Sequence, residues 1–234
     1  MADGLFSRTG IVLGEAGLHR LARAHVAIFG VGGVGSWCAE ALVRTGLGRI
    51  TLVDGDTVAA SNVNRQAMAM PGTVGQVKVA AMRERLLAIN PALKVEAIHA
   101  RFDEDTARSF DFAAFDAVVD AIDAVDDKAL LIRTAAAREN LAFVSSMGAA
   151  LRTDPTQERL GAFSRVAGDG LAKALRRRFR LDPPARDFVC VHSLEAPQVS
   201  ERLGRGSMMP VTCAFGMALA AATVKFLLAK TPEK

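Results

Sequence analysis

The glycine-rich turn Gly-Val-Gly-Gly-Val-Gly at residues 30–35 constrains the fold of this chain more than any other stretch. It follows an apolar, strand-like run and precedes a segment whose apolar residues have helical spacing. Glycines at such a junction let the backbone approach a ligand closely, and free N–H groups at the start of a helix attract anions. We therefore predict a nucleotide-binding turn made by four glycines, Gly30, Gly32, Gly33 and Gly35.

Asp54 supports this prediction, because it ends the next strand-like run, where a carboxylate can accept hydrogen bonds from ribose hydroxyls. The alternative is a tight strand–helix turn that binds no ligand. The glycine pattern by itself does not specify which nucleotide is bound.

The first 150 residues alternate between strand-like and helix-like segments. Strand patterns occupy 25–29, 49–56, 94–100, 115–123 and 141–150, whereas helical patterns occupy 36–48, 76–90 and 126–140. This alternation favours an α/β fold with a Rossmann-like, doubly wound and mostly parallel sheet joined by right-handed crossovers.

The character of the sequence changes after residue 150. A strand-like run at 159–166, a basic helical segment at 169–184, a strand-like run at 187–196 and a glycine-bearing loop at 197–210 follow in order. We expect a single domain over 1–234, divided into an N-terminal arm (1–24), a nucleotide-binding core (25–150), an elaboration of the same sheet (151–209) and a C-terminal apolar helix (210–234).

Composition narrows the class of protein. Half of the residues are hydrophobic, but the longest uncharged apolar run, 210–224, is shorter than the roughly 20 residues that span a bilayer. We therefore expect a buried or oligomer-interface helix there, and no membrane segment. The N-terminus lacks the apolar stretch of a signal peptide.

Cys38, Cys190 and Cys213 are isolated in the sequence, with no Cys-x-x-Cys pair. This predicts no zinc site, and a reducing, cytoplasmic location. The net charge of +4 and the pI of about 9.2 are compatible with an anionic partner.

The segment Ser-Asn-Val-Asn-Arg-Gln at 61–66 distinguishes between nucleotides. Backbone amides can largely hold the pyrophosphate of NAD, but an enzyme that activates the α-phosphorus of ATP must neutralise the departing pyrophosphate with cations. We therefore predict an ATP site built from polar side chains of this segment and from two later charged residues, one of which, Asp123, is also a tentative Mg²⁺ ligand: Ser61, Asn62, Asn64, Arg65, Lys78 and Asp123.

Each charged residue also has an ordinary structural interpretation. Arg65 would form a surface ion pair, Lys78 would be exposed in the first turn of a helix, and Asp123 would cap a helix. Their joint occurrence at successive strand ends favours ATP. An NAD-dependent oxidoreductase is an alternative from another class, but it leaves all three residues without a role.

The sequence from Gly30 to Gln66, followed by Gly-Gln-Val-Lys-Val, Ile-Asn-Pro and Asp-Ala-Ile-Asp, resembles the adenylating family of ubiquitin-activating enzymes and their bacterial relatives. This resemblance implies that ATP and Mg²⁺ convert a carboxylate into an acyl adenylate. It also implies a homodimer, in which the arginine matched by Arg8 acts in trans on the ATP of the other subunit. The nucleotide site is implied at Gly33, Asp54, Asn62, Arg65, Lys78 and Asp123.

Segments along nearly the whole chain, including Val-His-Ser-Leu-Glu-Ala-Pro-Gln at 191–198, are similar to one branch of this family, the tRNA threonylcarbamoyladenosine dehydratases. The similarity implies adenylation of the side-chain carboxylate of a modified adenosine at position 37 of tRNA. Ring closure by the ureido group then gains from proximity and requires no enzyme thiol. A monovalent cation and a sulfur-relay or sulfur-acceptor protein are further expectations.

This similarity implies that the basic helical segment at 169–184 binds tRNA phosphates, although a solvated helix face is the simpler interpretation. The residues concerned are Lys173, Arg176, Arg177, Arg178 and Arg180. His192 and Glu195 are candidates for positioning the substrate or are ordinary sheet-edge residues. We interpret Cys190 and Cys213 as packing residues.

Two further hypotheses remain open from the sequence. The first is adenylation of the C-terminus of a ubiquitin-like sulfur carrier, which the absence of Cys-x-x-Cys pairs and of a clearly placed nucleophilic cysteine disfavours. The second is a non-catalytic tRNA-binding protein that uses only the basic helix.

Overall fold

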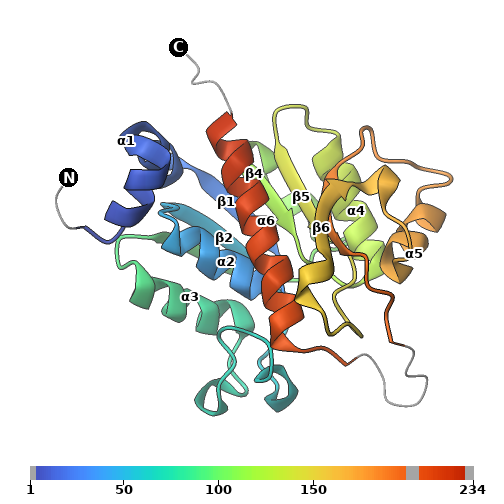
Figure 1. The fold of residues 1–234 in the computed structure, drawn as a ribbon, viewed down its shortest axis with the longest axis horizontal. Helices are drawn as coiled ribbons and strands as arrows, with labels where there is room; N and C mark the ends of the chain where they lie inside the picture. Colours follow the sequence, from blue (N-terminus) through green and yellow to red (C-terminus); the bar gives the residue numbers. More distant parts are fainter. Residues whose placement is uncertain (1–3, 199–205, 230–234) are drawn as a thin grey trace.

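The computed structural model describes residues 4–198 and 206–229, and a seven-stranded sheet forms their centre (Figure 1). The strands are β1 (His25–Phe29), β2 (Arg49–Val53), β3 (Lys94–Ile98), β4 (Ala117–Asp120), β5 (Ala142–Ser146), β6 (Glu158–Ala162) and β7 (Val189–Ser193). The α-helices are α1 (Ser7–Arg23), α2 (Gly35–Arg44), α3 (Lys78–Ile89), α4 (Val125–Ala136), α5 (Gly170–Arg178) and α6 (Met209–Ala229).

The strand order is β3-β2-β1-β4-β5-β7-β6, and every pair is parallel except the edge pair β6–β7. The chain first builds outward from β1 to β3 and then returns to build outward from β4. The carboxyl ends of β1 and β4 therefore flank the point where the winding reverses, which is the usual ligand crevice of such sheets. The predicted fold class is confirmed.

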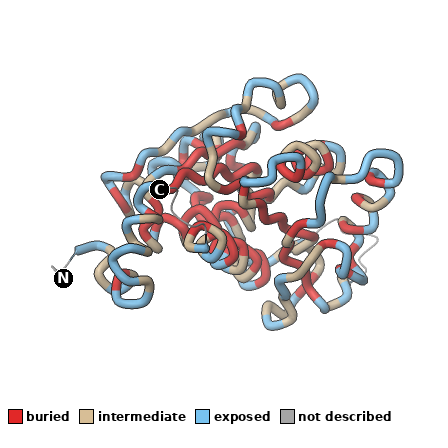
Figure 2. The backbone as a smooth tube through the Cα atoms, turned by 90° about the horizontal axis from the view of Figure 1, so that it is seen from above, coloured by how far each residue is buried: buried red, intermediate tan, exposed pale blue. Residues whose placement is uncertain are grey.

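Helices cover both faces of the sheet, and β1 is buried from end to end between them. Val26 and Ile28 belong to the apolar cluster that includes residues of α1, α2, α3 and α6, whereas Ala27 and Phe29 belong to the one that includes residues of α4 and α5. This alternation follows from the two-residue period of a strand. Figure 2 shows the buried segments gathered at the centre, with exposed segments around them.

The N-terminal arm contains a helix, α1, which sequence patterns did not predict. It is kinked at Gly14, whose φ of 71° favours glycine. Arg20 donates a hydrogen bond to the backbone carbonyl of Leu228, and this contact ties α1 to the end of α6.

In the described part of the chain, α6 is the one helix that is long and apolar enough to span a membrane by length and composition. Half of its most apolar stretch is buried within the protein. At Gly216 it lies so close to α2 that a Cβ atom would be 2.6 Å from the carbonyl oxygen of Val34. This face of α6 packs as a core helix does.

Candidate nucleotide-binding and active site

A cavity of about 960 Å³ lies at the carboxyl ends of β1, β2, β4 and β5. Most of the residues that the sequence predicts for a nucleotide site line this cavity, although they come from separate segments of the chain. Those that line it are Gly30, Gly32, Gly33, Asp54, Asn62, Arg65, Lys78 and Asp123. The predicted residues Gly35, Ser61 and Asn64 are not part of its lining.

The glycines of the turn have different tasks. Gly30 has a φ of 89°, and a Cβ atom there would lie 2.6 Å from the carbonyl oxygen of Ala121. Gly35 is buried, and a Cβ atom there would collide with the backbone of Gly30. At Gly32 the nearest atom to such a Cβ is 3.9 Å away. Gly30 and Gly35 therefore shape the turn, whereas Gly32 leaves space beside it for a ligand.

Asp54 braces the glycine turn. Its Oδ2 accepts a hydrogen bond of 2.7 Å from the backbone N–H of Val31, and its Oδ1 accepts one of 2.9 Å from that of Asp56. A carboxylate has about four lone-pair sites, so both oxygens can still accept from ribose hydroxyls.

Lys78 is the first residue of α3, but its side chain is only 8% exposed. Its Nζ lies 2.6 Å from Oδ2 of Asp56 and 3.9 Å from Oδ1 of Asp54. The interpretation of Lys78 as an exposed first-turn residue is therefore wrong. The structure holds its ammonium group in the cavity wall beside the carboxylate of Asp54.

Arg65 lies across the glycine turn. A Cβ atom at Gly33 would be 3.2 Å from Cγ and Cδ of Arg65, so the absence of a side chain at Gly33 gives the arginine room. Its Nη1 donates hydrogen bonds of 2.9 Å to the carbonyl of Ser61 and to Oδ1 of Asn64. These acceptors carry no full charge, which leaves the guanidinium charge available for an anionic ligand.

The other residues of the 61–66 segment support this loop. Asn64 donates to the carbonyl of Ser207 at 2.7 Å, and Oδ1 of Asn62 accepts from the backbone N–H of Ala59 at 3.0 Å. Gln66, which was not predicted, lines the cavity and is 6% exposed, and its Oε1 has no hydrogen-bond partner among residues 4–198 and 206–229. Its position directly after Arg65 is the sequence feature that could have predicted its place in the cavity.

Asp123 is exposed and lines the cavity. The residue that caps α4 is Ala124, so the interpretation of Asp123 as the helix cap is wrong. A fully buried ion pair lies beneath its turn: Nζ of Lys128 is 2.8 Å from Oδ2 of Asp120 and donates to the carbonyl of Ile122 at 2.9 Å. This pair holds the loop that presents Asp123.

Mg²⁺ bound with a nucleotide commonly needs only one or two protein carboxylates, because phosphate oxygens and waters complete its shell. Asp123 fits that requirement. Within residues 4–198 and 206–229, no cluster of three or more His, Cys, Asp or Glu side chains forms a metal cage.

The residues predicted for other contacts lie outside this cavity. Arg8 is exposed on α1 and does not line the site of its own chain. In the basic helix α5, Arg176 is engaged internally, because its Nη2 donates to the carbonyl of Phe163 at 3.0 Å and its guanidinium lies 5.1 Å from the Phe163 ring centroid. Arg178 pairs with Asp126.

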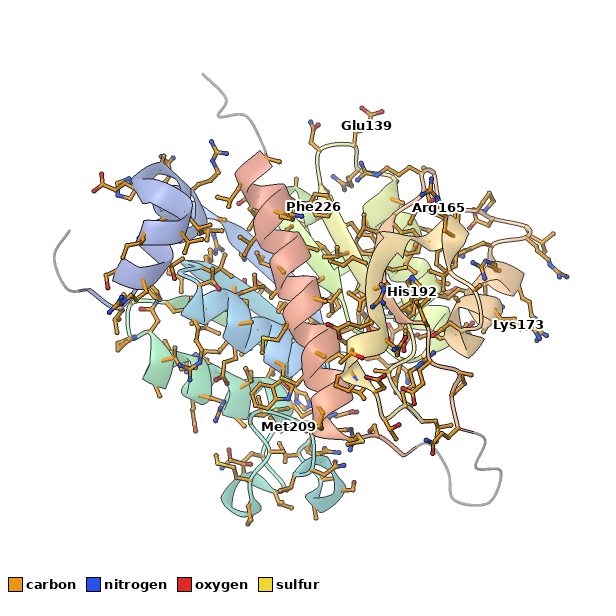
Figure 3. All side chains as sticks on the ribbon, viewed as in Figure 1. Glu139, Arg165, Lys173, His192, Met209 and Phe226 are labelled. Carbon is orange, nitrogen blue, oxygen red and sulfur yellow. The ribbon has the colours of Figure 1, made fainter. Side chains whose placement is uncertain are left out.

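Three basic residues of this region, Lys173, Arg177 and Arg180, are exposed. Figure 3 shows the labelled side chain of Lys173 extending outward from α5. These three are the members of the predicted tRNA-binding set whose charges are free of the internal contacts that engage Arg176 and Arg178.

His192 and Glu195 do not line the cavity either. Burial lowers the pKa of His192, which is 8% exposed. Glu195 accepts hydrogen bonds from the backbone N–H groups of Asp154 at 2.9 Å and Thr153 at 3.0 Å, and these bonds lower the pKa of its carboxyl group. Glu195 therefore organises a loop of the elaboration.

Cys38 and Cys190 are buried, Cys213 is half-buried, and none of the three lines the cavity. Burial raises the pKa of Cys190 to about 12 and also raises the pKa values of Cys38 and Cys213. A raised pKa disfavours the thiolate, which is the nucleophilic form.

A model of the ThiF family matches residues 6–234. The chain belongs to the ThiF family. This ThiF-family chain is 41% identical over 194 residues to the tRNA threonylcarbamoyladenosine dehydratase of Bacillus subtilis, covering 83% of this chain and 76% of the relative. The predicted family is confirmed.

Solved structures of the Escherichia coli tRNA N6-threonylcarbamoyladenosine dehydratase, in complex with AMP and with ATP, are similar to this ThiF-family protein with TM-scores of 0.90 and 0.89. Both are 36% identical to it and cover 96% of this chain, and it covers 94% and 93% of theirs. The Salmonella typhimurium molybdopterin-synthase adenylyltransferase is 38% identical, but over only 47% of this chain.

Proposed function

We propose that this protein is an ATP-dependent enzyme that cyclises and dehydrates the threonylcarbamoyl side chain of a modified adenosine in tRNA. One observation carries the proposal: a single cavity gathers the glycine turn, Arg65, Lys78 and Asp123. The similarity to dehydratases supports the choice of substrate, because it extends through the elaboration, whereas the match to the sulfur-carrier type of relative covers about half of the chain.

The first step forms an acyl adenylate. An oxygen of the substrate carboxylate attacks the α-phosphorus of ATP, and the bond from this phosphorus to the bridging oxygen breaks, so that pyrophosphate leaves. Lys78 and Arg65 stabilise the negative charge that develops on the departing phosphates. Gly32, Gly33 and Val34, which directly precede α2, line the same cavity, and the start of a helix favours phosphate binding.

The second step closes a ring. The ureido group of the same side chain attacks the activated carbonyl, AMP leaves with one oxygen of the original carboxylate, and the attacking group loses a proton. The side chain therefore loses the elements of water. Intramolecular attack gains from proximity, so no protein thiol is required. The raised pKa values of the three cysteines, which disfavour the thiolate, are compatible with this route.

Mg²⁺ belongs to the proposal as the ion that neutralises phosphate charge when ATP is bound. Asp123 would hold it, and the Lys128–Asp120 pair fixes the loop that carries this carboxylate. A monovalent cation and a sulfur-relay partner stay predictions from the resemblance.

A homodimer also belongs to the proposal. Ile11 and Val12 of α1 are 66% and 81% exposed, and Met217 of α6 is 40% exposed on the helix face opposite its buried side. Such apolar surface on adjacent helices is typical of an interface. Arg8 lies on α1 beside this surface and away from its own cavity, as required of a residue that acts in trans.

We further propose that tRNA phosphates contact Lys173, Arg177 and Arg180, and that the enzyme works in the cytoplasm. All three cysteines are free, which supports a reducing compartment.

The deciding experiment incubates the protein with ATP, Mg²⁺ and tRNA that carries threonylcarbamoyladenosine. We expect nucleoside mass spectrometry to show the loss of one water from this base, with release of AMP rather than ADP. If the substrate carboxylate carries ¹⁸O, one labelled oxygen should appear in AMP. Turnover of ATP without any change in the base would contradict the proposal, as would stimulation by a Gly-Gly protein tail instead of tRNA.

The trans role of Arg8 has a separate test. The variants Arg8→Ala and Lys78→Ala should each be inactive, but mixed dimers contain one complete site. With random pairing, half of the dimers are mixed, so about one quarter of wild-type activity should return after co-refolding. Failure to recover activity, with mixed dimers demonstrated by mass spectrometry, would exclude the trans arrangement.

A further inference from the structure

A second buried ion pair, Arg152–Asp169, lies in the wall of the same cavity. Nη2 of Arg152 is 3.0 Å from Oδ2 of Asp169, and the two residues are 3% and 4% exposed. Both residues line the cavity. Neither is among the residues predicted from the sequence, and neither has a role in the adenylation chemistry described above.

The pair joins three segments that are distant in sequence. Nε of Arg152 donates to the carbonyl of Glu195 at 3.0 Å, and Nη1 donates to the carbonyl of Gly148, just after β5. Asp169 accepts from the backbone N–H of Gly148 at 3.2 Å and caps α5 by accepting from that of Ala172 at 2.9 Å. The pair therefore fixes the end of β5, the start of α5 and the loop after β7 relative to one another.

The segments that it fixes form the wall of the cavity. Gly148, Gly170, Leu171 and Ala174 all line it. Gly170, Ala174 and Arg177 follow one another at helical spacing on α5, so the stripe that faces the cavity continues to an exposed arginine. The same helix thus contributes to the cavity wall at its start and to the proposed tRNA surface further along.

Stability alone is a weak reason for such a pair. Desolvation of two charges offsets most of their attraction, and apolar replacements of buried pairs are often neutral or stabilising. A pair that lines a ligand cavity and makes hydrogen bonds to three segments can hold the wall of that cavity in one geometry.

We propose that Arg152 and Asp169 are positioning residues, which hold the Gly148 turn and the start of α5 as the wall that receives the threonylcarbamoyl side chain. This inference rests on the proposed function. It makes these segments the part of the cavity that binds the substrate. It also links the fit of the threonylcarbamoyl side chain to α5, the helix that we propose contacts tRNA.

The test uses the neutral pair Arg152→Gln/Asp169→Asn, because changing both residues avoids an unpaired buried charge and Asn retains the capping ability of Asp. We expect ATP affinity to change less than about twofold, while kcat/KM for modified tRNA falls by about 10²-fold, as for a small misplacement of reacting groups. Calorimetry with ATP and steady-state kinetics with tRNA measure the two quantities.

The matched control is Arg133→Gln/Asp182→Asn. That pair also has an N–O distance of 3.0 Å and removes the same charges, but its side chains are 28% and 72% exposed and do not line the cavity. It should behave as wild type. A third variant, Arg152→Lys, retains the charge opposite Asp169 but loses the fork of donors, and it should recover only part of kcat/KM.

Three results would count against the inference. Wild-type kinetics in the neutral pair would show that the geometry does not depend on Arg152 and Asp169. A parallel loss of ATP affinity and thermal stability would reduce the pair to a general structural role. Failure of the wild-type enzyme itself to convert modified tRNA would instead refute the proposed function, and the inference with it.

Discussion

The two halves of the cavity are built in different ways. The half that we propose binds the nucleotide consists of a backbone turn and of side chains that follow β1, β2 and β4, each next to a conspicuous sequence pattern. The half that we propose receives the substrate is held by contacts of the Arg152 side chain with the carboxylate of Asp169 and the backbone carbonyl of Glu195, which join segments remote from one another in sequence.

This difference has a functional meaning. Triphosphate binding needs donors and cations at fixed places around one turn, which parallel strand ends supply by topology. Recognition of a modified nucleoside needs a wall shaped by several loops, which topology alone does not supply. We therefore expect variants of the first half to lose chemistry altogether, and variants of the second to lose selectively the reaction with tRNA.

The largest effect is expected for Lys78→Met, which keeps the apolar stem and removes the charge. AMP release with modified tRNA should fall by about 10²–10³-fold, because one stabiliser of the developing phosphate charge is removed. tRNA binding in a filter assay should persist. Lys94→Met, an exposed site at the start of β3, is the control. Normal AMP release by a folded Lys78→Met protein would show that Lys78 has no role in adenylation.

A smaller loss is expected for Asp123→Asn. Turnover should fall by about 10²-fold, equivalent to about 2.7 kcal/mol, because a neutral amide is a weaker Mg²⁺ ligand than a carboxylate. The Mg²⁺ concentration for half-maximal rate should rise, and EDTA should abolish wild-type activity. Glu104→Gln, which neutralises an exposed carboxylate outside the cavity lining, should leave the Mg²⁺ titration unchanged.

The two halves of the cavity also differ in how much of each can be predicted from the sequence. Periodicity is local, so the alternating strands and helices were predictable, and the rule for parallel strand ends correctly grouped Asp54, Lys78 and Asp123. The Lys128–Asp120 and Arg152–Asp169 pairs were missed, because only the tertiary fold brings their partners together.

Two further features of the structure could not be predicted without the three-dimensional fold. In the basic run 173–180, Arg176 has the same sequence context as its neighbours, but the amphipathic helix turns it onto Phe163. The helix α1 was missed, because the kink at Gly14 interrupts its periodic pattern.

An intermediate effect is expected for the double variant Lys173→Ala/Arg177→Ala. KM for tRNA should rise by about tenfold, and the salt dependence of binding should weaken by roughly one unit of slope for each phosphate that the variant no longer neutralises. ATP affinity should stay unchanged, since neither residue lines the cavity. Arg83→Ala, on the exposed face of α3, is the control. An unaltered salt slope would place the tRNA elsewhere on the surface.

The smallest effect concerns Glu195, whose carboxylate ties the Thr153–Asp154 turn to the loop that Arg152 also contacts. Hydrogen bonds from this turn lower the pKa of Glu195 in the folded state. Its stabilising contribution is therefore complete above the unfolded pKa of about 4.3 and disappears as the pH falls through the lower folded pKa.

Urea unfolding of wild type and Glu195→Gln tests this directly. Wild type should be modestly more stable at pH 7, and the difference should shrink at pH values below about 4, where the glutamate becomes neutral like the glutamine. A difference that does not depend on pH would show that the charge of Glu195 is irrelevant. Because the loop of Glu195 also anchors Arg152, the variant should raise KM for tRNA slightly and leave ATP binding unchanged, the pattern expected of the substrate half.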